Sequence, residues 1–155
     1  MSFFVNAPQE EAFNLVMDYF MGRRMKILTS NAPYYIRAEF GSWISSSLGS
    51  SKGEVETNIV KKNSESYVNL SLNFLKEYLS ATLMTIGAAL VTSVIYGMLG
   101  VDVLFTLSTI LFIVAILWGI VGYDVSLTRR RFIEEFNMFI QSLASKKPNS
   151  NSTYL

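Results

Sequence analysis

The clearest pattern in the chain is a pair of uncharged apolar runs, residues 79–99 and 103–123, separated by a short turn that contains Gly100 and Asp102. Each run has about 20 residues, which is enough for a helix to cross a hydrocarbon core of roughly 30 Å. Apolar residues occupy every position over 110–117, so a helix there has no polar face. The pattern predicts a transmembrane helical hairpin.

Two buried helices in the core of a soluble protein are the alternative interpretation of these runs. Such helices must be enclosed on all sides, and a chain of 155 residues has little material left to do so. We therefore favour the transmembrane interpretation.

Residues 1–76 show the patterns of one helix and several strands. Over 8–21, apolar side chains recur at helical spacing, with Pro8 in the first turn and Gly22 after the last one. Other segments alternate between apolar and polar side chains, which is the period of a strand. These predicted strands are residues 2–6, 26–29, 34–40, 54–61 and 67–74. Together they predict an antiparallel sheet with one apolar and one polar face.

A second amphipathic helix is predicted after the hairpin, over residues 128–144, where Phe132, Phe136 and Ile140 recur on one stripe. We expect this helix to cover the part of the apolar sheet face that the first helix leaves open. The alternative is that it lies flat on the membrane, with its arginines against anionic headgroups.

The expected fold class is therefore an α+β membrane protein. Residues 1–76 plus 128–144 form a small two-layer β-α-β-β-β-β…α cytoplasmic domain, and the transmembrane hairpin of residues 79–123 is inserted before the last helix. Residues 145–155 are polar and predict a disordered tail.

The basic residues indicate the orientation of the hairpin. All 13 lysines and arginines lie outside it, eight before and five after, and the only charge in the turn is Asp102. Because Lys and Arg are enriched in cytoplasmic flanks, we expect both termini in the cytoplasm and an integral location in a plasma or inner membrane. The first residues have no signal-peptide pattern, and the absence of cysteine is compatible with a reducing compartment.

The amino-acid composition excludes many kinds of catalytic site. The chain has no histidine and no cysteine, which excludes the usual nucleophile–base pairs, zinc sites and thiolate clusters. It also has no nucleotide-binding motif. Glu54 and Glu56 share one face of a predicted strand, but a solvated sheet face explains them better than a catalytic pair. We expect no enzymatic activity, no cofactor and no metal site.

The segment 41–53 is rich in glycine and serine, and its hydroxyls and amides are suited to hold an anion. Its tryptophan is suited to a membrane interface. The candidate residues for binding an anion or a lipid headgroup are Ser42, Trp43, Lys52, Arg129, Arg130 and Arg131. A plain hairpin loop is the alternative for this segment. For Asp124, at the inner end of the second run, we expect an interfacial salt bridge or a helix end.

Small residues recur along both hairpin helices and predict where helix backbones approach each other. These candidate helix-packing residues are Thr85, Ala89, Ser93, Gly97, Ser108, Ala115 and Gly122. We expect them mainly to pack the two helices on each other, while bulky residues face lipid or a partner subunit.

A hairpin without catalytic chemistry predicts a non-enzymatic membrane protein, an accessory or assembly subunit of a larger membrane complex. The expected partners are the lipid bilayer and other membrane-protein subunits or a second copy of the chain, and no nucleic acid. The alternative is a membrane-tethered module that binds a lipid or a small apolar ligand. An apolar cavity between sheet and helices would distinguish this module from a subunit.

Overall fold

The computed structural model describes residues 1–41, 51–62 and 65–146, and the chain divides into two compact units. The sheet unit comprises Met1–Gly41, Glu54–Asn73 and Arg129–Leu155, and the helical unit comprises Ser42–Gly53 and Phe74–Thr128. Of the tail expected over 145–155, the part from residue 147 on lies outside the described residues.

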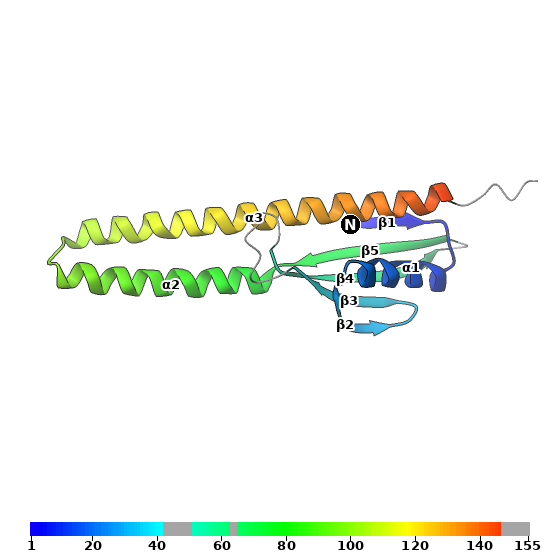
Figure 1. Ribbon diagram of the computed structural model, residues 1–155, viewed down its shortest axis with the longest axis horizontal. Helices are drawn as coiled ribbons and strands as arrows, with labels where there is room; N and C mark the ends of the chain where they lie inside the picture. The colour runs from blue at the N-terminus through cyan, green and yellow to red at the C-terminus, as the bar shows by residue number, and fades with distance from the viewer. Residues whose placement is uncertain (42–50, 63–64, 147–155) are drawn as a thin grey trace, which may run out of the picture. The chain divides into compact units, whose positions relative to one another are not determined.

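Five strands form one antiparallel sheet in the sheet unit, as the alternating patterns predict (Figure 1). The strands are β1 (Ser2–Val5), β2 (Lys26–Asn31), β3 (Tyr35–Phe40), β4 (Gly53–Lys62) and β5 (Glu65–Asn73). Their order across the sheet is β1-β5-β4-β3-β2, so the first strand pairs with the last. Val68 lies opposite both Phe3 and Ile59, which places these apolar side chains on one face of the sheet.

The helix α1 (Gln9–Gly22) covers part of this apolar face. Glu10 and Glu11 lie in its first turn, where the helix dipole favours negative charge. The side chains that α1 buries recur at helical spacing, namely Ala12, Phe13, Val16, Tyr19 and Phe20. The Gln9 side-chain amide also donates a hydrogen bond to the Ile59 carbonyl at 2.7 Å, which ties the start of α1 to β4. The helix predicted over 8–21 is confirmed.

The helix α3 (Val103–Lys146) differs from the sequence-based expectation. Separate helices are predicted over 103–123 and 128–144, but the structure has one continuous helix, so this prediction is wrong. The physical reason is that residues 124–128 contain no glycine or proline that would end a helix. Asp124 is therefore a residue inside a helix and does not mark a helix end.

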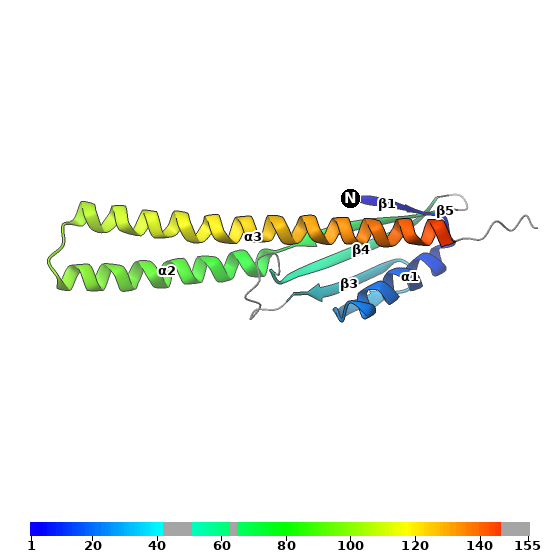
Figure 2. The same ribbon diagram turned by 45° about the horizontal axis from the view of Figure 1, so that its top comes forward.

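The C-terminal part of α3 packs on the apolar sheet face beside α1 (Figure 2). Phe136 is fully buried, and its ring lies edge-on to Phe3 of β1 at 5.0 Å and to Tyr19 of α1 at 5.3 Å between ring centroids. Phe132 stacks on Phe40 of β3 at 5.0 Å. The structure thus has this part of α3 docked on the sheet, and the sheet unit is a two-layer α+β fold.

The opposite face of the sheet is polar. Asn69 lies opposite both Ser2 and Asn58, and the Ser2 hydroxyl donates to the Asn69 side-chain oxygen at 2.6 Å. On the same strand, Val68 and Leu70 are buried on the apolar face, as the period of two requires.

In the helical unit, α2 (Leu75–Met98) and the first part of α3 run antiparallel (Figure 1). Gly100 has a φ of +67°, a left-handed conformation that glycine adopts at little cost, and it helps to reverse the chain. Asp102 caps α3, since its carboxylate accepts a hydrogen bond from the Leu104 backbone N–H at 2.8 Å. The turn predicted around Gly100 and Asp102 is thus observed.

Candidate membrane-facing surface

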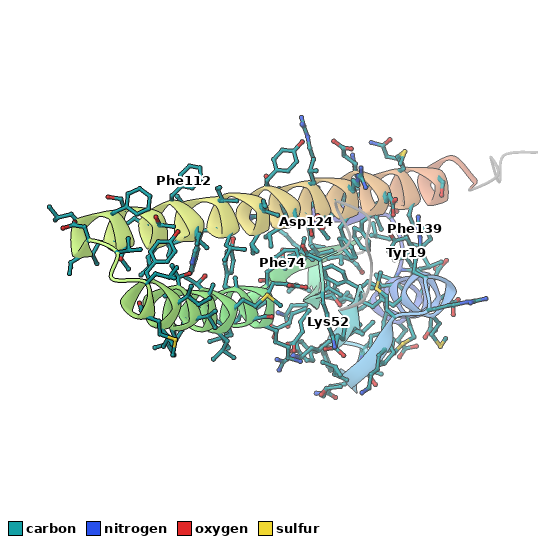
Figure 3. All side chains as sticks on the ribbon, turned by 60° about the vertical axis from the view of Figure 1, so that its left-hand side comes forward. Tyr19, Lys52, Phe74, Phe112, Asp124 and Phe139 are labelled. Carbon is teal, nitrogen blue, oxygen red and sulfur yellow. The ribbon has the colours of Figure 1, made fainter. Side chains whose placement is uncertain are left out.

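Most of the surface of the helical unit is apolar. Among the described residues, Leu75–Met98 and Val103–Ser142 are long and apolar enough to cross a membrane. Core helices of soluble proteins meet the same criterion, but they are mostly buried, whereas only 6% and 0% of the most apolar stretches are buried here. Length and composition therefore allow a membrane span, and exposure favours it. Figure 3 shows Phe112 pointing away from α2.

Several hydroxyl groups on these helices are satisfied within their own helix. Six of them donate to the backbone carbonyl four residues earlier at 2.8–3.0 Å, namely those of Thr82, Thr85, Ser93, Thr106, Ser108 and Thr109. Each bond gives the hydroxyl proton an acceptor inside the helix, which is what a helix surrounded by lipid requires. These polar residues are thus compatible with apolar surroundings.

Aromatic pairs join the two helices at both ends of the hairpin. Tyr78 stacks with Trp118 at 6.0 Å between ring centroids, and Tyr96 stacks with Phe105 at 6.1 Å. Tyr78 and Tyr96 are 18 residues apart on α2, which corresponds to about 27 Å along the helix. This length is close to the hydrocarbon thickness of a bilayer, at whose two interfaces aromatic residues are enriched.

The predicted helix-packing residues do not all face the neighbouring helix. Thr85, Ala89 and Gly122 are half-buried. The other four are exposed, namely Ser93, Gly97, Ser108 and Ala115. A Cβ added at Gly97 would meet no atom within 4 Å.

The physical reason lies in the spacing of the stripe on α2. Each step of four residues turns about 40° past a full helical turn. After three such steps, from Thr85 to Gly97, the stripe has moved about 120° around α2 and away from α3. For the four exposed residues, a role in helix packing stays a prediction.

A polar cluster lies at the base of the hairpin, within the helical unit. The Ser51 backbone N–H donates to the Thr128 hydroxyl at 3.1 Å, and the Ser51 hydroxyl donates to the Asp124 carboxylate. The Lys52 backbone N–H donates to a Glu77 carboxylate oxygen. These bonds tie the segment before β4 to both α2 and α3. No local sequence pattern marks them, because the partners are 25 to 77 residues apart.

The candidate anion-binding residues are only partly described. Ser42 and Trp43 lie outside the described residues. Lys52 is half-buried, and Arg129, Arg130 and Arg131 are exposed on α3. Within the described ranges, no group of three or more His, Cys, Asp or Glu side chains could hold a metal ion.

The two glutamates considered as a catalytic pair share an arginine. The Arg37 Nε donates to the Glu54 carboxylate at 3.0 Å and lies 3.5 Å from a carboxylate oxygen of Glu56. The hydrogen bond to Glu54 raises the pKa of Arg37, so its positive charge is held firmly between the two carboxylates. This arrangement favours a structural ion-pair network on the polar face of the sheet.

Tyr19 is a buried titratable side chain beside the docked helix. In the part of the chain that the structure describes, its hydroxyl is the only buried side-chain polar atom without a hydrogen-bond partner. Burial raises the pKa of Tyr19 above its ordinary value, so the hydroxyl stays protonated at neutral pH and is unsuited to act as a base.

The most distinctive surface of the molecule is thus the apolar exterior of the hairpin, with aromatic rings at its ends and a polar cluster at its base. Comparisons with models of known protein families, with curated proteins and with solved structures found no match for this chain.

Proposed function

We propose that the chain is an integral membrane protein and acts as a non-enzymatic accessory or assembly subunit of a larger membrane complex. The observation that carries this proposal is the exposed apolar surface of the hairpin. Leu83, Leu111 and Phe112 are 71%, 68% and 67% exposed. Soluble monomers rarely expose contiguous apolar patches of more than a few hundred Å². Such a surface needs lipid or protein to cover it.

Three features of the hairpin favour a bilayer as its surroundings. The helices are long enough to span it, and six of their hydroxyls find acceptors within their own helix. The aromatic residues Tyr78 and Tyr96 are also spaced by about the thickness of the hydrocarbon core. A water-facing hairpin would require none of these features.

The charges flanking the hairpin favour an orientation with both termini in the cytoplasm. Lys76 precedes the apolar part of α2, and Arg129 to Arg131 follow the apolar part of α3. The turn carries one charge, that of Asp102. By the positive-inside rule, the turn lies on the far side of the membrane.

Single cysteines should report this topology without ambiguity, because the chain has no native cysteine. We expect Leu99→Cys, in the turn, to react with a membrane-impermeant maleimide added to intact cells. Leu99 is 70% exposed, and the substitution leaves the Asp102 cap intact. Asn58→Cys, on the exposed polar face of the sheet, should react only after the membrane is permeabilised.

The reverse labelling pattern would contradict the proposed orientation. Equal labelling of both cysteines in intact cells would contradict a hairpin that spans the membrane.

The proposed subunit role is supported by the kinds of surface that the chain presents. The whole sequence has no histidine or cysteine, and the carboxylates Glu54 and Glu56 are engaged by Arg37. What remains are two surfaces suited to contact other proteins: the apolar exterior of the hairpin within the bilayer and the polar face of the sheet.

Purification of the tagged full chain from its native membrane in a mild detergent tests this role. We expect an integral membrane protein to co-purify in fixed stoichiometry, so that the protein mass of the particle exceeds the 17.5 kDa of one chain. A particle that contains one chain and no companion would contradict the subunit role and leave membrane insertion untouched.

The alternative of an apolar-ligand module requires space between sheet and helices. Aromatic rings lie close together there, with the centroids of Tyr19 and Phe139 4.6 Å apart (Figure 3). The centroids of Phe132 and Phe136 are 6.4 Å apart. Among the described residues, these close ring contacts favour a packed core over a ligand-binding space.

A further inference from the structure

The exposed face of α3 changes its chemistry along the helix. Ile116 and Ile120 are exposed apolar residues, Tyr123 is 59% exposed, and the side chain of Arg130 is 78% exposed. Tyr123 and Arg130 are seven residues apart, about two helical turns, so they lie on the same side of α3. An apolar, then aromatic, then basic order is what a helix presents where it leaves a bilayer.

Three consecutive arginines follow the apolar stretch of α3, and Arg130 is the one on the side of Tyr123, because successive residues point about 100° apart. Arg129, Arg130 and Arg131 are all exposed. The planar guanidinium group can donate two parallel hydrogen bonds to a phosphate, which a lysine ammonium cannot do. Arg130 also pairs with Glu134 at 3.3 Å, but both side chains are largely exposed, and such a surface pair is weak enough to yield to a phosphate.

We propose that Arg129, Arg130 and Arg131 bind the phosphate groups of anionic phospholipids in the cytoplasmic leaflet. This inference rests on the proposed membrane insertion, which brings the end of the apolar stretch of α3 to headgroup level. Phosphatidylcholine also has a phosphate, but its choline cancels the charge. Phosphatidylglycerol keeps a net negative charge, and each basic residue at the surface favours such a lipid by about fivefold.

Spin-labelled lipids measure this preference directly. The full chain is reconstituted in phosphatidylcholine vesicles that contain a trace of spin-labelled phosphatidylglycerol or spin-labelled phosphatidylcholine. The motionally restricted fraction of each label gives its relative association constant. We expect phosphatidylglycerol to associate more strongly with the wild-type chain, and we expect Arg129→Gln/Arg130→Gln to reduce this preference by up to about 25-fold, fivefold for each arginine.

The matched control is Lys61→Gln/Lys62→Gln, which removes the same charge from two exposed positions of β4 and should keep the preference. Salt at 1 M should abolish the wild-type preference, because it shortens the Debye length to about 3 Å. Circular dichroism checks that both double variants retain their helices.

The preference would be refuted by equal association of both lipids with the wild-type chain, or by a preference that the arginine variant retains. Displacement of spin-labelled phosphatidylglycerol by millimolar inorganic phosphate would assign the site to free phosphate instead. Flotation of the vesicles after an alkaline carbonate wash tests membrane insertion separately from the lipid-binding site. A chain that is washed off refutes membrane insertion, whereas a chain that stays without preferring phosphatidylglycerol refutes only the lipid site.

Discussion

Phe136→Ala should destabilise the sheet unit by about 3–5 kcal/mol, a large part of the 5–15 kcal/mol that keeps a typical domain folded. Phe136 is fully buried, and its ring contacts Phe3 of β1 and Tyr19 of α1, so truncation leaves a cavity between elements that are far apart in sequence. We expect residues 1–41 to become sensitive to protease. Limited proteolysis of the full chain, with the cleavage sites mapped, measures this change.

Met138→Ala is the matched control, because Met138 lies on the same helix and is 61% exposed. It should leave the protease resistance of residues 1–41 unchanged. If Phe136→Ala also leaves it unchanged, α3 does not complete the core of the sheet unit, and the docked arrangement is wrong. If the loss of resistance occurs, the sheet unit depends on residues synthesised after the whole hairpin.

Leu111→Arg should impair insertion of the hairpin into the membrane. Leu111 is 68% exposed and lies near the middle of the apolar stretch of α3. An arginine at the centre of a transmembrane helix costs about 2.5–3.5 kcal/mol on insertion scales, whereas an arginine at an exposed site in water costs very little. We expect a smaller membrane-bound fraction after carbonate extraction and faster degradation in the cell.

Val103→Arg controls for the charge itself. Val103 is 71% exposed on the same helix, but it lies next to the turn, where an arginine side chain can reach the interface. We expect this variant to insert like the wild type. Equal and undiminished membrane association of both variants would show that the hairpin is not surrounded by lipid, and the proposed function would then fail.

Most of the sheet unit could be predicted because β3, β4 and β5 carry alternating burial patterns. Val68 and Leu70 alternate with Tyr67 and Asn69, and this period of two identifies both the strand and its buried face. The helix α1 is equally local, since its apolar residues recur at helical spacing between Pro8 and the end of the helix. The two long apolar helices were also predictable, because length and composition suffice to find them.

The continuity of α3 was not predicted, because the change from an apolar run to an amphipathic stripe resembles a boundary between two helices. The backbone ends a helix only where a residue or a cap stops it, and residues 124–128 provide no stop. The bonds from Ser51 to Thr128 and Asp124 were missed for a different reason. They join Ser51 to residues of α3 that follow more than 70 residues later in the chain. A serine in a serine-rich segment shows no sequence pattern from which its hydrogen-bond partner could be predicted.

Local periodicity and composition were therefore sufficient for most strands, for α1, for the two long apolar stretches and for the absence of histidine and cysteine. These properties depend on the order of neighbouring side chains, which the sequence states directly. Only the tertiary structure shows which aromatic rings contact Phe136, that Gly97 does not face a neighbouring helix, and which groups form hydrogen bonds with Ser51. These contacts depend on distances between residues that are remote in sequence. Many side chains of the same chemical type could form them, and only the packing of the folded chain determines which ones do.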